Sequence, residues 1–152
     1  MWAKSENLKD FNLDSKDFLI LEHLESDASL TPKNLAHALG IPQTTVHNRI
    51  RKLKQLGIIK KYVAILDYGK LNKPLTAYVM IDIAYQEHQE ISKKLAAMPF
   101  VTEVTAVTGA NDILIKVRAK DAEGLGDIVL RNLKRLGGVA RTETMLVLET
   151  IK

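Results

Sequence analysis

The spacing of apolar residues changes near residue 66, from a purely helical period to a mixture of strand-like and helix-like stretches. A helix buries a stripe that recurs every three to four residues, whereas a strand alternates between its two faces. This change indicates two architectures, and 152 residues suffice for two small domains. The polar, glycine-containing stretch Asp67–Lys73 is typical of a linker. We therefore predict domains over residues 1–66 and 74–152, joined by a linker over residues 67–73.

Three helices are predicted in the first domain, because each apolar stripe has its own start and stop signals. Asp14 is suited to cap the first helix. Thr31 followed by Pro32 is typical of the start of a second helix, which Gly40 ends. A third helical stripe follows a tight turn and continues to Gly57. Two helices joined by so short a turn predict a helix-turn-helix unit.

A short extended wing is predicted directly after the third helix. Apolar residues in Ile58-Ile59 and in Tyr62–Leu66 flank the pair Lys60-Lys61. Such residues favour an extended chain. The first domain is therefore predicted to be a winged helix-turn-helix domain, whose third helix would enter the major groove of DNA.

Basic residues are concentrated in this domain, where the interval from Ala28 to Leu66 contains no Asp or Glu. Its Lys and Arg residues are Lys33, Arg49, Arg51, Lys52, Lys54, Lys60 and Lys61. A solvated basic face is the alternative interpretation. Because the block coincides with the helix-turn-helix pattern, we favour binding to the phosphates of double-stranded DNA.

The exposed side of the third helix carries residue types that suit DNA recognition. The predicted base-reading residues are Gln43, Thr44, His47 and Asn48. The predicted phosphate contacts are Arg51, Lys52, Lys54, Lys60 and Lys61. Arg49 lies nearer the core edge, so it either bridges helices or reaches a phosphate. Any one of these polar residues would equally suit an exposed helix without a function, and the set as a whole supports the prediction.

The second domain is predicted to have the element order βαββαβ. The predicted strands are Thr76–Ile83, Val101–Val107, Ile113–Arg118 and Val139–Glu149, and the predicted helices are Glu87–Ala97 and Ala122–Leu136. This order is typical of the ferredoxin-like fold, an antiparallel sheet with both helices on one face. The predicted fold class is therefore α+β.

The first and last predicted strands are apolar on both faces, as Tyr78 and Met80 beside Val79 and Ile81 illustrate. A sheet with one solvated face alternates apolar and polar residues instead. Edge trimming or cover by the linker would account for this pattern. We favour cover by a second subunit, because a two-fold dimer would also place two DNA-binding domains on a palindromic site.

The sequence lacks the groups that most enzyme classes require. It has no cysteine, no phosphate loop and no nucleophile and base at a recognisable spacing, and its four histidines are isolated from one another. A small enzyme using Glu103, Asp112 or Glu143 with His88 is the least favoured alternative. We predict no catalysis, no metal and no cofactor. With no signal peptide and no membrane-length apolar run, we expect a cytoplasmic protein without a membrane partner.

An ordered set of fragments resembles the Lrp/AsnC family of prokaryotic regulators from Leu13 to Lys152. In the first half these are Leu13-Asp14, Asp17, Ile20-Leu21, Leu35-Ala36, Leu39-Gly40-Ile41, Thr45-Val46, Arg49-Ile50, Leu53 and Gly57-Ile58-Ile59. In the second half they are Val101, Thr108–Asp112, Gly138-Val139 and Thr142–Thr144. Pro42 and Ser29 depart from the serine and arginine common in the family, so the family's DNA specificity does not transfer.

The resemblance implies dimers through the second domain, further association to an assembly such as an octamer, and an amino-acid effector bound between dimers. The implied effector-binding residues are Gly109, Ala110, Asn111, Asp112, Thr142, Glu143 and Thr144. Asp112 suits an α-ammonium group, and backbone amides with threonine hydroxyls suit a carboxylate. Alternatively, Gly109 and Asp112 only shape the turn between strands.

These observations predict a sequence-specific DNA-binding transcription regulator that an amino acid or related small molecule modulates. The second hypothesis is an architectural DNA-binding protein without an effector, whose binding would depend on the backbone and fall uniformly with salt. The operator, the sign of regulation and the identity of the effector do not follow from the residues.

Overall fold

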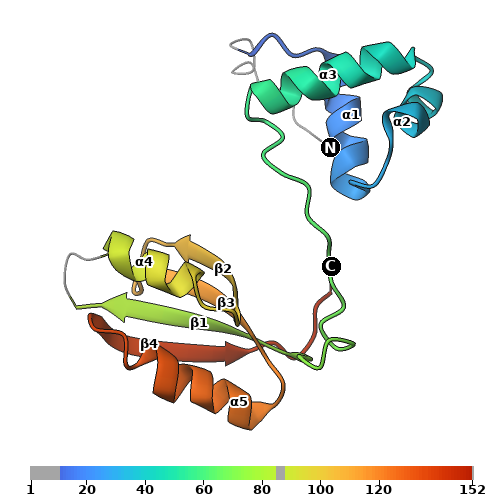
Figure 1. The fold of residues 1–152 in the computed structure, drawn as a ribbon. Helices are drawn as coiled ribbons and strands as arrows, with labels where there is room; N and C mark the ends of the chain where they lie inside the picture. The colour runs from blue at the N-terminus through green and yellow to red at the C-terminus, as the bar shows by residue number, and fades with distance from the viewer. Residues whose placement is uncertain (1–10, 85–87, 152) are drawn as a thin grey trace. The chain divides into compact units, whose positions relative to one another are not determined.

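The computed structural model describes residues 11–84 and 88–151. The chain divides between Ile65 and Leu66 into two compact units, and each has its own apolar core. The first unit is helical, and the second combines a sheet with helices (Figure 1). Within the described residues, no helix is both long and apolar enough to cross a membrane.

The first unit consists of α1 (Ser15–Ser26), α2 (Pro32–Leu39) and α3 (Gln43–Gln55). The predicted caps are confirmed. The Asp14 carboxylate accepts hydrogen bonds from the amides of residues 16 and 17, and the Thr31 hydroxyl accepts one from the amide of residue 34. Both caps satisfy amides that lack a partner in the first helical turn. Gly40 ends α2 at φ +63°, a conformation that favours glycine and sets up the turn into α3.

Side chains from all three helices form the core of this unit. The fully buried or nearly buried members are Ile20 and Leu24 from α1, Leu35 from α2, and Val46 and Leu53 from α3. Because Val46 and Leu53 lie seven residues apart, they occupy the same side of α3 and turn its opposite side toward solvent. The predicted helix-turn-helix unit is confirmed.

The predicted wing does not form a strand pair in the described residues of this unit. The amides of Ile58 and Ile59 both donate to the Leu53 carbonyl and complete the end of α3. Beyond them, residues 60–66 have no assigned helix or strand, and their side chains are exposed. The physical reason is that a strand needs a partner for its backbone groups, and residues 11–65 of the first unit contain no second strand.

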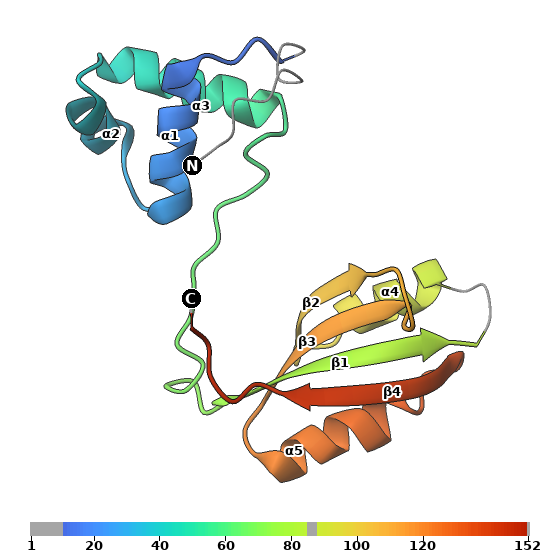
Figure 2. The same ribbon diagram turned by 180° about the vertical axis from the view of Figure 1, so that it is seen from behind.

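The second unit contains β1 (Leu75–Ile83), α4 (His88–Ala96), β2 (Val101–Ala106), β3 (Ile113–Ala119), α5 (Ala122–Asp127), η2 (Ile128–Leu133) and β4 (Val139–Leu146). The sheet order is β2-β3-β1-β4, and all neighbouring strands are antiparallel (Figures 1 and 2). This arrangement confirms the predicted βαββαβ order and its α+β class.

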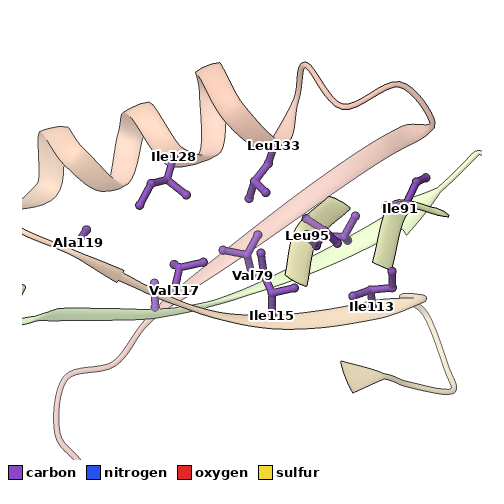
Figure 3. Close-up of a cluster of buried hydrophobic side chains, with 11 residues drawn as sticks. Val79, Ile91, Leu95, Ile113, Ile115, Val117, Ala119, Ile128 and Leu133 are labelled. Carbon is purple, nitrogen blue, oxygen red and sulfur yellow. The ribbon is translucent and has the colours of Figure 1, made fainter. Parts of the chain in front are cut away.

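The core of this unit lies between the sheet and its helices (Figure 3). Ile91 and Leu95 of α4 and Leu133 of η2 are fully buried against alternate residues of the central strands β1 and β3. Gly138 precedes β4 at φ +92°, and a Cβ atom there would lie 2.8 Å from Ile91 Cδ1. The chain therefore enters β4 in a conformation and at a distance that only glycine accommodates without strain.

The last helix and the last strand both differ from their predicted form. Residues 122–136 were expected to form one α-helix, but α5 continues as the π-helical segment η2. Its wider turn brings Ile128 and Leu133, five residues apart, to the same core. β4 ends at Leu146 instead of Glu149. In the register of Leu146 with Ala77, Glu149 would lie opposite the residue before Leu75, where β1 begins, so it has no strand partner there.

Candidate nucleic-acid interface

The predicted base-reading residues share the solvent-exposed part of α3. Gln43, Thr44, His47 and Asn48 are all exposed, whereas Val46 beside them is fully buried. Arg51, one turn further along, is also exposed, and its Nη2 donates to Asn48 Oδ1 at 3.3 Å. The structure thus brings together hydrogen-bonding groups of the kinds that recognise base edges in the major groove.

Arg49 has a different environment, because its guanidinium bonds two carboxylates at the start of α1. Nη1 donates to Asp14 Oδ1 at 2.7 Å and to Asp17 Oδ1 at 2.8 Å. The Asp17 side chain is 1 % exposed, so its contact with Arg49 is largely shielded from water, whereas Asp14 is 54 % exposed. Of the two roles left open for Arg49, the structure places it in the bridge between helices.

The ion pair also holds the pKa of Asp14 below its ordinary value. The largest cause is the hydrogen bond from Arg49, and the backbone amides of the helix cap act in the same direction. The hydrogen bonds from Arg49 to Asp14 and, second in size, to Asp17 raise the pKa of Arg49. A negative charge at a helix N-terminus is favourable in itself, so Asp14 and Asp17 stabilise α1 and anchor α3 together.

Lys52 lies on the same flank of α3 as Arg49. Its Nζ donates to the Asn12 carbonyl at 2.7 Å and lies 4.0 Å from Asp17 Oδ2. These contacts join α3 to the start of α1, and the side chain remains partly exposed. Lys52 therefore has partners within the unit, whereas Lys60 and Lys61 in the following segment are exposed and form no ion pair with the described residues.

The contacts of Arg49 and Lys52 fix the orientation of α3 and so determine which of its sides faces solvent. One flank of the helix is tied to α1 by ionic contacts, its inner side is buried in the core, and its outer side remains open. A recognition helix needs such a fixed orientation, because base-edge hydrogen bonds tolerate little displacement. The sequence identified Asp14 as a capping residue, but the link from Arg49 to Asp14 and Asp17 spans more than thirty residues and has no local signature.

The predicted effector turn connects β2 to β3. Within it, Asp112 Oδ2 accepts a hydrogen bond from the Ile83 amide at 2.7 Å, and the Asp112 amide donates to the Ile81 carbonyl at 3.1 Å. Asn111 Nδ2 donates to Asp82 Oδ1 at 2.7 Å. These bonds give Asp112 a structural role at the end of β1, and its predicted role in effector binding stays a prediction. The turn is thereby attached to the end of β1, where the register with β4 shifts.

The predicted effector residues of β4 do not share one face of the sheet. Thr142 and Thr144 are opposite Ile81 and Val79, whose side chains are buried under the helices. Glu143 is opposite Met80 and therefore points to the other face. Gly109, Ala110 and Asn111 belong to the β2–β3 turn, and β1 and β3 separate β2 from β4 in the sheet.

Two family models match the chain, one for each half. A model described as winged helix-turn-helix DNA-binding matches residues 13–60, and a model described as the Lrp/AsnC ligand binding domain matches residues 76–152. The first match covers the three helices, and the second covers the βαββαβ unit from the second residue of β1 onward.

Similar proteins and structures agree with these matches. An HTH-type transcriptional regulator of Pyrococcus furiosus is 42% identical over 143 residues, covering 92% of this chain and 95% of the relative. Another, from Pyrococcus horikoshii, is 34% identical over 140 residues, covering 92% of each. Among solved structures, AsnC of E. coli aligns with a TM-score of 0.81 at 27% identity, covering 92% of this chain and 95% of AsnC.

A complex of a Neisseria meningitidis transcriptional regulator with L-Met is also similar, with a TM-score of 0.87 and 26% identity over 93% of each chain. Both halves therefore match the same kind of protein in the same order, at the DNA-facing helices and at the sheet. On these grounds the chain belongs to the Lrp/AsnC family of transcriptional regulators.

Proposed function

We propose that this regulator binds DNA sequence-specifically, with the exposed side of α3 in the major groove. The observation that carries the proposal is the anchoring of α3. Its inner side is buried and one flank is tied to Asp14 and Asp17, while Thr44, Asn48 and Arg51 stay exposed. An α-helix fits the major groove, where every base pair presents a distinct pattern of donors and acceptors. Its proposed place of action is the cytoplasm, where the chromosome of a prokaryote lies.

A second function is an architectural one, in which the protein binds DNA with little sequence preference. The acid-free interval from Ala28 to Leu66 favours it, because a uniformly basic surface attracts phosphates whatever the sequence. The two functions differ in one measurable property. A regulator retains a preferred site at physiological salt, whereas backbone binding weakens steeply and equally on all sequences.

The experiment is a fluorescence anisotropy titration on the best duplex from a random pool and on a scrambled duplex, at physiological salt. Asn48→Ala is expected to lose about 1–3 kcal/mol of discrimination at one base pair and to leave binding to the scrambled duplex unchanged. Asn34→Ala is the matched control, because Asn34 is exposed on α2. Equal losses on both duplexes would refute base reading by Asn48 and favour the architectural function.

We further propose that two copies associate through the face of the sheet opposite the helices. Tyr78 and Met145 are cross-strand partners on this face, and Met145 is 45 % exposed. Tyr68 contributes partial cover, since its ring stacks on Arg118 at 4.3 Å. Met145→Glu is expected to shift the protein toward monomer in sedimentation, whereas Leu148→Glu, beyond the end of β4, is not. Unchanged assembly in Met145→Glu would exclude this face.

An amino-acid effector is proposed for the second unit. The support is its match to the Lrp/AsnC ligand binding domain and its similarity to a regulator solved with L-Met. L-Met is the first probe, followed by the other amino acids, by calorimetry and by their effect on DNA affinity. An effector must change the free energy of DNA binding or assembly, and the linkage is reciprocal. Absence of any such change would leave a regulator without an effector.

A further inference from the structure

A cleft of about 380 Å³ lies beside α3, on the flank away from Asp14 and Asp17. The cleft is bounded by the turn before α2 with the first residue of that helix, by one flank of α3, and by the segment that follows α3. The lining residues used below are Leu30, Pro32, His47, Arg51, Lys54 and Tyr62. All belong to the first unit.

Two cationic side chains, Arg51 and Lys54, line this cleft beside apolar residues. His47, Arg51 and Lys54 are spaced by four and then three residues, so they form one stripe along α3. No acidic residue lines the cleft. Across the described ranges 11–84 and 88–151, neither Arg51 nor Lys54 forms an ion pair with a carboxylate. The ligand that matches such a lining carries negative charge.

The diameter of a helix and the width of the major groove indicate that this ligand is the sugar-phosphate backbone of DNA. The major groove is about 12 Å wide and a helix with its side chains is about 10–12 Å across, so the flanks of an inserted helix face the two sugar-phosphate walls. On one flank of α3, Arg49 already bonds Asp17 of α1, and Lys52 bonds the Asn12 carbonyl, which precedes that helix. The cleft lies on the other flank.

We propose that this cleft receives one phosphate of the DNA backbone, with Lys54 and Arg51 as its charge partners and Tyr62 as a positioning residue. The inference rests on the proposed DNA-binding function and goes beyond it, because it assigns a backbone contact to one flank of α3 and a role to the segment after the helix. Leu30 and Pro32 supply the apolar wall against which the adjoining deoxyribose packs.

Tyr62 acts through Lys54. The Lys54 Nζ lies 4.6 Å from the centre of the Tyr62 ring, within the range of a cation–π interaction. A lysine side chain otherwise has many rotamers, and ordering them opposes binding. By holding Nζ at the cleft before DNA arrives, the ring reduces that entropic penalty.

The test measures DNA affinity of the full chain against salt concentration, on the preferred and the scrambled duplex. Lys54→Gln is expected to weaken binding roughly tenfold on both duplexes, as for the loss of a hydrogen bond to a charged group. The slope of log affinity against log salt should fall by about 0.9, the value for one phosphate. Lys120→Gln changes the charge equally at an exposed site of the second unit and should change neither quantity. A Lys54→Gln slope equal to that of Lys120→Gln overturns the proposal.

Tyr62 is tested by two substitutions. Tyr62→Phe keeps the aromatic face and should bind like the parent, whereas Tyr62→Leu keeps an apolar side chain, loses the ring and should weaken binding on both duplexes. Equal affinities of the two variants overturn the positioning role, and circular dichroism verifies that both fold. Failure of the parent protein to bind any duplex would refute DNA binding itself. If the parent protein binds DNA and the Lys54→Gln variant binds equally well, only the phosphate contact at the cleft is refuted.

Discussion

Replacement of Asp17 by Asn should destabilise the first unit far more than the same change at Asp14. Asp17 is 1 % exposed and accepts from Arg49 Nη1 at 2.8 Å, and its other oxygen accepts from the Asp14 amide at 3.1 Å. Asn keeps an acceptor for the amide but removes the negative charge. Arg49 is then left 22 % exposed with only the more solvated Asp14 as a partner.

The magnitude follows from the burial of the two partners. Removing one member of a buried ion pair typically costs about 3–5 kcal/mol, because the other charge stays buried. Arg49 retains some solvent and its bond to Asp14, so we discount this to about 2–3 kcal/mol. Asp14 is 54 % exposed, and Asp14→Asn should cost about 1 kcal/mol or less, since Asn also caps helices well. A small domain is stable by about 5–15 kcal/mol, so the difference is measurable.

The assay is urea denaturation followed by circular dichroism at 222 nm, with hydrogen exchange of the α1 and α3 amides to assign the loss to the first unit. The double variant Asp17→Asn/Arg49→Met removes both charges and should be more stable than Asp17→Asn alone. The reasoning is refuted if Asp17→Asn lowers the free energy of unfolding no more than Asp14→Asn does. It is also refuted if the loss of stability in the double variant equals the sum of the losses in Asp17→Asn and Arg49→Met.

Three further predictions concern single positions. Gly138→Ala should destabilise the second unit by about 2–3 kcal/mol in thermal unfolding, because φ is +92° and the new Cβ would lie 2.8 Å from Ile91 Cδ1; an unchanged melting temperature would contradict this. Asp112→Ala should lose about 1–3 kcal/mol, because the Ile83 amide loses its acceptor, and the amide of residue 83 should exchange faster with solvent. The pKa of Asp14 is lowered in the folded state, so its contribution to stability is complete above its unfolded value near 3.8 and is lost as pH falls through the folded value. Acid unfolding of Asp14→Asn should lack this component, and identical pH profiles for parent and variant would disprove it.

Elements with local signals were predictable from the residues. The Asp14 and Thr31 caps and the Gly40 stop depend on neighbouring backbone groups, so their residue types alone indicated where the helices begin and end. The order of helices and strands along the chain was also predictable, because apolar periodicity is a property of neighbouring residues. Strand pleating already implied that Glu143 and Thr144 point to opposite faces, although both were assigned to one effector site.

Element ends were less predictable where a distant partner decides them. β4 does not reach Glu149 because, in its register with β1, that residue would lie beyond the start of β1 at Leu75, a limit set by a strand more than sixty residues away. Leu148, which follows β4, continued the strand pattern in sequence but is 94 % exposed in the structure. The predicted wing differs for the same reason, since residues 60–66 have strand-like composition without a partner strand in the described first unit.

The sequence by itself determined the helix-turn-helix unit, the βαββαβ order, the basic interval and the exposed polar residues of α3. The tertiary structure alone decided which cations of α3 have partners within the fold. Arg49 and Lys54 are only five residues apart, yet one bonds Asp14 and Asp17 and the other lies over Tyr62 beside an open cleft. The reason is geometric. Five residues turn a helix by about 140°, so the two side chains meet different neighbours, which only the packing of distant segments brings there.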